Sequence, residues 1–132
     1  MAPPVRFPIR FTGANRAMGL LGIDPSACRV ELDEAQLHVH MGWAFALHAP
    51  LADVVSAAPD HDRVTGWGVH GWRGTWLVNG SSSGIVRIEL DPPARARTLG
   101  FTVDVGVLRV SVDDPDGLLD ALRTTPQGYA SA

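Results

Sequence analysis

The sequence predicts a single, mostly β domain: a small antiparallel barrel or sandwich of about seven strands, followed by one C-terminal α-helix. Apolar and polar residues alternate with a period of two through most of the chain, which is typical of half-buried strands. The 14 Gly and 10 Pro among the 132 residues separate these alternating runs as turns would. Only residues 114–123 combine a capping residue with an apolar stripe at helical spacing, so one helix is expected.

In the first half of the chain, residues 5–11 alternate and contain Pro8, which cannot donate to a strand ladder; they predict an edge strand. Residues 30–41 alternate on both sides of a polar turn and predict a hairpin. The apolar odd-numbered face continues through Trp43 to residue 49. The segment is therefore one long bent strand or two strands hinged at Gly42.

The second half contains a further strand, a turn-rich segment, a second hairpin and the last strands. The expected elements are a strand at 52–58, turns at 59–74, a hairpin of 76–79 with 85–90, a break at 91–93, and strands at 99–105 and 108–112. Asp114 is suited to cap the final helix, Pro115 to occupy its first position, and Leu118, Leu119 and Leu122 to form its apolar stripe. The domain is predicted to span residues 1–126, with a loose tail at 127–132.

Two stretches resemble the bacterial pleckstrin-homology-like (PH-like) superfamily in their pattern. VELDEAQLHVHMG at residues 30–42, followed by APLADV at 49–54, has the order of strand, turn, strand ending in Gly, strand and Pro-hydrophobic-x-x-hydrophobic step. LRVSVDDPDGLLDAL at 108–122 is similar to that superfamily's final strand and C-terminal helix. The resemblance covers about half the chain and implies a PH-like barrel. By analogy with a family of mostly non-catalytic scaffolds, it also implies binding or assembly.

Composition excludes several classes of partner and location. The formal net charge is −3, so nucleic acid is not an expected partner. No stretch has the length of a bilayer span or the uninterrupted apolar core of a secretory signal, and we therefore expect a cytoplasmic protein without integral membrane association. The single Cys28 has neither a disulfide partner nor a second thiol at metal-ligand spacing; it is predicted to be a small buried residue. No cofactor is predicted.

Three histidines are the candidate metal ligands. His38 and His40 project from one face of a strand, and His48 shares that face if the strand is continuous. Ten extended residues would place His48 about 30 Å from His38, so all three meet only if the chain folds back at Gly42. In the absence of a grouped carboxylate or thiol, a solvated polar face is the favoured interpretation, and no metal site is predicted.

No local motif indicates catalysis, and no catalytic residue is predicted. The sequence contains no G-x-S-x-G elbow, P-loop or H-E-x-x-H motif. The serines at 81–83 could bind an anion through their amides, but a simple turn is the favoured interpretation. The sequence DHD at 60–62 is expected to be a solvated turn.

Residues 66–76, GWGVHGWRGTW, are the most distinctive segment, with three of the four Trp and four Gly in eleven residues. Gly costs backbone entropy, and indole rings near the surface can stack on a planar ligand, hold a cation or anchor a partner. The other interpretation is that the rings are structural and cover the core at the end of the barrel. The predicted ligand- or partner-binding residues are Trp67, His70, Trp72, Arg73 and Trp76.

The sequence therefore predicts a non-enzymatic cytoplasmic binding module that contacts an unidentified protein or small molecule through residues 66–76. A homo-oligomer formed through the edge strand 5–11 is a further expectation, because exposed edges recruit strands. The alternative is a small hydrolase or metal-dependent enzyme that uses His38, His40 and His48.

Overall fold

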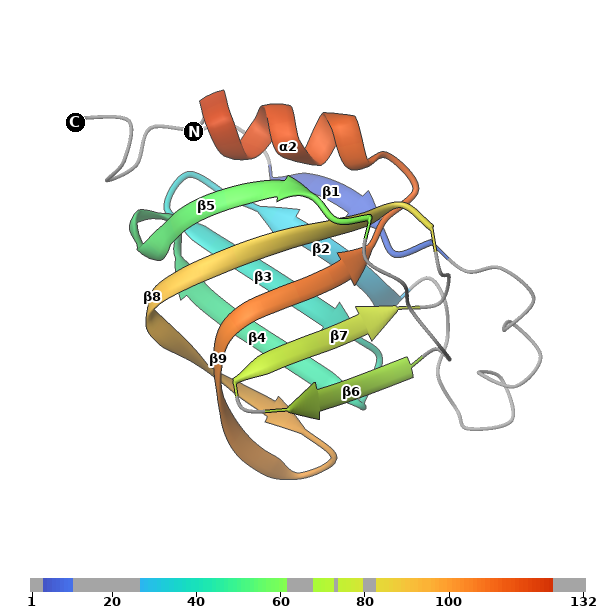
Figure 1. The fold of residues 1–132 in the computed structure, drawn as a ribbon, viewed down its shortest axis with the longest axis vertical. Coiled ribbons are helices and arrows are strands. Elements are labelled where there is room, and N and C mark those ends of the chain that lie inside the picture. The colour runs from blue at the N-terminus through green and yellow to red at the C-terminus, as the bar shows by residue number, and fades with distance from the viewer. Residues whose placement is uncertain (1–3, 11–26, 62–67, 73, 80–82, 125–132) are drawn as a thin grey trace.

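The computed structural model describes residues 4–10, 27–61, 68–72, 74–79 and 83–124 (Figure 1). This part of the chain forms, in order, β1 (Val5–Pro8), β2 (Cys28–Leu32), β3 (Gln36–Met41), β4 (Phe45–Pro50), the short 3-10 helix η2 (Leu51–Asp53), β5 (Val54–Pro59), β6 (Gly68–Trp72), β7 (Thr75–Asn79), β8 (Ile85–Thr98), β9 (Phe101–Ser111) and α2 (Pro115–Thr124). Within these residues the fold is mostly β with a C-terminal helix, as predicted. The tail at 127–132 lies outside the described residues.

The strands belong to one sheet that curls into a half-barrel (Figure 1). The strand order is β1-β2-β3-β4-β8-β9-β7-β6, and β5 also pairs with β8. The first half of β8 pairs with β5 and its second half with β4, while β9 pairs along its other edge. An isolated bridge between Ile9 and Val112 joins the chain just after β1 to the chain just after β9. This bridge brings the two sides of the curled sheet together at one end.

Several details of the predicted topology are wrong. Nine strands are described rather than about seven, partly because residues 68–72, expected as turns, form β6. β7 does not pair with β8 but lies parallel to β9, with Trp76 opposite Leu108, because β8 already has β5 or β4 on one edge and β9 on the other. The sheet is therefore not purely antiparallel. Residues 91–93 bend β8 without ending it, since the irregular register there needs no donors from Pro92 and Pro93.

The segment at 37–49 forms two strands that fold back on each other. Gly42 adopts φ 53°, a left-handed conformation that Gly reaches easily, and β3 and β4 pair on either side of the turn. Trp43 lies in this turn with its side chain 58% exposed. The sequence placed Trp43 on the apolar face because the turn preserves the alternation across it; that placement is wrong.

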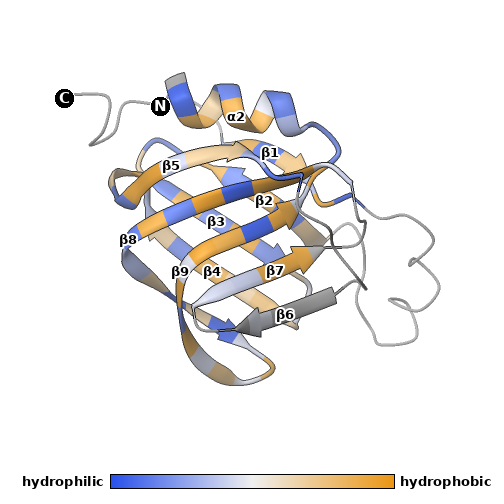
Figure 2. Ribbon diagram, in the orientation of Figure 1, coloured by the Kyte–Doolittle hydropathy of each residue, from blue (hydrophilic) through white to orange (hydrophobic). Residues whose placement is uncertain are grey.

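The core fills the concave side of the half-barrel, and α2 covers one end of it (Figure 1). Figure 2 shows the alternation of hydropathy along the strands that produces this core. The helix begins as predicted: the Asp114 carboxylate accepts a hydrogen bond from the Gly117 N–H at 3.0 Å. Leu118, Leu119 and Leu122 are buried in the core, and α2 packs against β5 and β8. No helix among the described residues is long and apolar enough to cross a membrane.

Candidate functional site

The predicted binding segment forms the β6–β7 hairpin at one end of the sheet order. Trp67 and Arg73 lie outside the described residues, and for His70 and Trp72 only the backbone, within β6, is described. Among the described strands, β6 pairs only with β7 and is the last strand of the sheet. The role of these four side chains in binding remains a prediction.

Trp76, on β7, packs against the core. It is partly buried, and its ring centroid lies 6.5 Å from that of the buried Phe45. Its indole also lies against Gly71, its partner across the hairpin, so closely that a Cβ at Gly71 would clash with the ring. Trp76 therefore attaches the hairpin to the core, which agrees with the structural interpretation of this ring.

At the opposite end of the strand order lies β1, and other residues already contact part of the outer edge of its segment. Ile9 bridges Val112, and the Arg10 backbone N–H donates to the Ser111 carbonyl at 2.9 Å. These contacts engage the C-terminal end of the predicted edge strand 5–11, of which residue 11 lies outside the described residues. In the described part of the chain, the outer edge of β6 takes part in no strand pairing.

The three candidate histidines do meet, because the chain folds back at Gly42. His38 stands opposite His48 in the β3–β4 register, and their Nδ1 atoms are 2.6 Å apart. The His40 and His48 ring centroids are 5.2 Å apart. The Nε2 atom of His38 also lies 3.0 Å from an Asp33 carboxylate oxygen. Asp33 is the grouped carboxylate that the sequence alone did not place beside the histidines.

The electrostatics of this cluster favour the neutral imidazole at His40 and at His48. Burial lowers the pKa of His40 and of His48, and charge on the neighbouring imidazoles lowers both pKa values further. The pKa of Asp33 is also lowered, first by a hydrogen bond from the Ala35 backbone N–H and then by the hydrogen bond with His38. In the contact between the His38 and His48 Nδ1 atoms, one ring nitrogen donates and the other accepts.

The spacing of the histidines is that of a hydrogen bond rather than of a metal site. Two nitrogens bound tetrahedrally to zinc at about 2.0–2.1 Å would be separated by about 3.3 Å, and the His38 and His48 Nδ1 atoms are 2.6 Å apart. In the part of the chain that the structure describes, no group of three or more His, Cys, Asp or Glu side chains is arranged to hold a metal ion.

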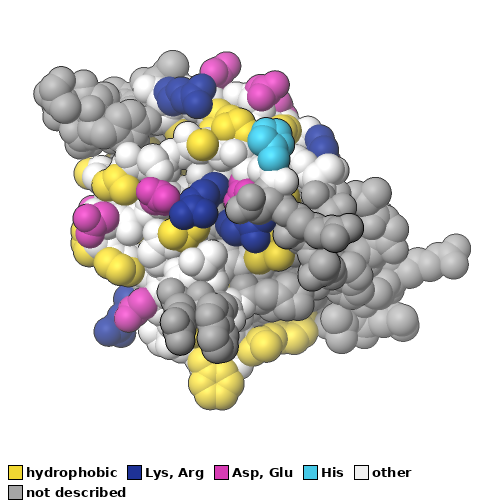
Figure 3. All heavy atoms as spheres, viewed as in Figure 1, with side chains coloured by type: hydrophobic (Ala, Val, Ile, Leu, Met, Phe, Trp, Pro, Cys, Tyr) yellow, Lys and Arg dark blue, Asp and Glu magenta, His cyan; other side chains and the backbone are white. Residues whose placement is uncertain are grey.

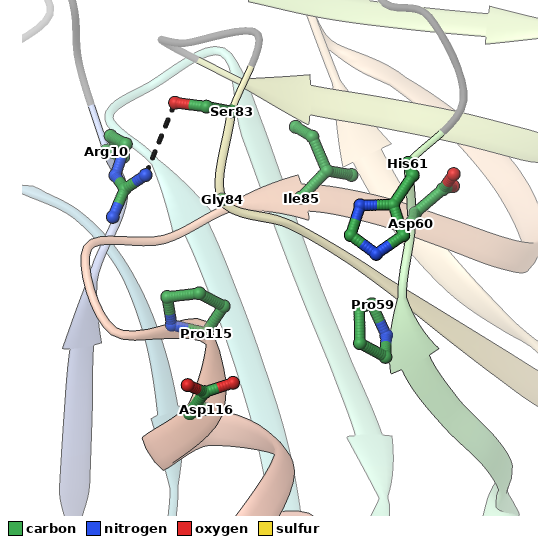
Figure 4. A pocket seen from close by; sticks show the side chains of 9 residues that line it. All are labelled: Arg10, Pro59, Asp60, His61, Ser83, Gly84, Ile85, Pro115 and Asp116. Carbon is green, nitrogen blue, oxygen red and sulfur yellow. Dashed lines mark hydrogen bonds between the residues drawn. The ribbon is translucent and has the colours of Figure 1, made fainter.

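A cavity of about 460 Å³ lies between the start of β8, the end of β5 and the beginning of α2 (Figure 4). Its polar lining residues are Arg10, Asp60, His61, Ser83 and Asp116. Arg10 and Ser83 lie on one side, Asp60 and His61 on another, and Asp116 on the helix (Figure 4). The volume falls in the range of small-molecule sites.

Two of the ionic groups around this cavity, Arg10 and Asp60, make contacts within the protein. Arg10 donates to the Ser83 hydroxyl at 3.2 Å and to the Asp113 carbonyl at 2.9 Å. Asp60 accepts a hydrogen bond from Arg109 at 2.6 Å, and its side chain is only 5% exposed. The expectation that Asp60 belongs to a solvated turn is therefore wrong. These contacts hold strand ends together, and no local motif could have revealed them because the partners are 49 to 103 residues apart.

Comparison of the chain with protein-family models, with curated proteins and with solved structures gives no match.

Proposed function

We propose that this chain is a non-enzymatic cytoplasmic binding module with a PH-like barrel, and that an extended segment of a partner protein binds along β6. The position of β6 as the last strand among the described strands carries this proposal. An exposed edge strand can accept a further strand through main-chain hydrogen bonds. Gly68 and Gly71 leave two positions of this edge without side chains that would hinder a partner. The pattern at residues 28–55 and 108–122 supports the PH-like assignment.

The hairpin register indicates which backbone groups of β6 point outward. Trp72 pairs with Thr75, and the pair that closes a two-residue connection exchanges both of its hydrogen bonds. His70 bonds to its own partner on β7 in the same way, because such pairs alternate along an antiparallel ladder. The N–H and C=O groups of Val69 and Gly71 therefore point away from β7. A partner strand would pair with these groups.

The contact between Gly71 and the Trp76 ring supports the same interpretation. It ties the edge strand, through its neighbour, to the core around Phe45. A strand held in place before binding loses less conformational freedom when a partner pairs with it. The Gly-rich composition and the partly buried indole are thus consistent with an edge strand that is ordered before a partner binds.

The test is a selection of random displayed peptides on the purified protein, followed by affinity measurements with the selected peptides. Val69→Pro removes an outward N–H and spares the hydrogen bonds to β7. Val69→Thr is the matched control, since it keeps the N–H and the β-branched shape. We expect the selected peptides to bind the wild type and Val69→Thr equally, and Val69→Pro at least about tenfold more weakly. A selection without binders, or equal binding to all three proteins, would refute the proposal.

A further inference from the structure

Three large apolar side chains are exposed at the end of the half-barrel away from α2. Trp43 is 58% exposed in the turn between β3 and β4; Leu99 and Phe101 are 58% and 72% exposed at the turn between β8 and β9. The Leu99 backbone N–H donates to the Ala44 carbonyl at 3.2 Å, which joins the two turns. We call Trp43, Leu99 and Phe101 the hairpin tip. Figure 3 shows hydrophobic side chains projecting at this end of the molecule, where the β8–β9 hairpin turns.

The backbone at Leu99 indicates that the tip does not serve folding alone. Leu99 has φ 50°, and it is the non-Gly residue with positive φ in the described chain. L-amino acids with large side chains are disfavoured in this left-handed conformation, whereas Gly and Asn adopt it readily. A Leu that is mostly exposed gains little packing to offset this strain. The side chain is therefore better explained by a contact outside the protein.

We propose that the hairpin tip inserts into the interface of an anionic lipid bilayer. Trp, Phe and Leu are the residue types that bury their apolar surface at the boundary between headgroups and acyl chains. A stable interface between two proteins buries about 800 Å² on each partner through about 20–30 residues. Three side chains on two projecting turns fall far short of that, but each can enter a bilayer without needing a complementary shape.

The charges near the hairpin tip favour a bilayer with a negatively charged surface. Arg95 and Arg97 are exposed on β8 just before the turn, and only Asp104 is an acidic cross-strand neighbour, 3.4 Å from Arg95. Arg97 stands between Ala46 and Thr102, which carry no charge. At the helix end, four acidic side chains, Asp113, Asp114, Asp116 and Asp120, outnumber the basic Arg10, which pairs with Asp113, and Arg123. An anionic surface would attract the tip and repel the opposite end, in spite of the net negative charge.

The decisive variant is Leu99→Gly. Gly adopts φ 50° without steric strain, so a loss of binding by this variant would not be explained by unfolding. Binding is measured by co-sedimentation with vesicles of equimolar phosphatidylcholine and phosphatidylglycerol, and with vesicles of phosphatidylcholine alone. We expect Leu99→Gly to keep or raise the melting temperature and to bind the anionic vesicles at least about tenfold more weakly. Phe101→Ser should weaken binding similarly. Val55→Ser, which changes an exposed apolar residue on β5, is the matched control and should bind as the wild type does.

Four results would overturn the proposal. The wild type could fail to bind at millimolar lipid, or bind both kinds of vesicle equally. Leu99→Gly could bind as well as the wild type. Light scattering could instead show a dimer that Leu99→Gly converts to a monomer, in which case the tip contacts a second copy of the chain.

Discussion

Replacing Asp60 by Asn would test how the end of β5 is fixed to the sheet. Asp60 directly follows β5, and its carboxylate lies 2.6 Å from Nε of Arg109 on β9, with the two side chains 5% and 17% exposed. Arg109 also stands opposite Arg87 in the β8–β9 register. Removing the carboxylate would leave a mostly buried guanidinium beside a second one.

The expected loss of stability follows from this burial. Breaking a buried ion pair by removing one partner costs about 3–5 kcal/mol, and the residual exposure of Arg109 favours the lower end, about 3 kcal/mol. Unfolding entropy is about 2.1 cal/mol/K per residue, or about 0.28 kcal/mol/K for 132 residues. The melting temperature of Asp60→Asn should therefore fall by about 11 °C.

Thermal unfolding followed by circular dichroism measures this change, and Glu89→Gln is the control. Glu89 forms the ion pair with Arg87 at 3.0 Å, where both side chains are partly exposed, so its loss should lower the melting temperature far less than the loss of the Asp60 carboxylate does. If Asp60→Asn lowers the melting temperature no more than Glu89→Gln does, the buried pair does not fix β5 and the reasoning is wrong.

Two further predictions concern stability. Because the folded state lowers the pKa of His40 and His48 below 6.5, the unfolded chain protonates first, so the free energy of unfolding should fall as the pH drops from about 6.5 through the lowered values. Urea titrations between about pH 5 and 7 should show a shallower fall for His48→Asn; an identical fall would contradict the role of this cluster. Gly71→Ala should lower stability by about 1–3 kcal/mol through its clash with Trp76, whereas Gly106→Ala, with no neighbour closer than 3.9 Å, should lower it less. Equal losses in calorimetry would contradict this.

The sequence predicted local elements well because their causes are local. Alternation placed β2, β3 and β4 within one or two residues, and Asp114 with Pro115 placed the start of α2. Which strands pair with each other was harder to predict from the sequence. A parallel pairing of β7 with β9 depends on which edges are free after the whole sheet has formed, and no residue of β7 encodes that choice.

The same distinction applies to the sites. From the sequence, His38 and His48 were expected to lie close together only if the chain turned back at Gly42, and the structure has this turn. It could not pair Asp60 with Arg109, because 49 residues separate them. It assigned Trp43 to the apolar face because a tight turn preserves the two-residue alternation, and only the structure shows that Trp43 is exposed.

The two proposed surfaces are positioned to act together. Gly74, in the turn of the β6–β7 hairpin, accepts hydrogen bonds through its carbonyl from the N–H groups of Gly106 and Val107 on β9. Gly106 is five residues from Phe101 along the same strand, which corresponds to about 17 Å at the rise of a β-strand. A partner strand bound to β6 would thus begin close to a bilayer that holds the hairpin tip. Together, the proposals imply a module that brings its partner to a membrane surface, with the charge at the tip setting its orientation.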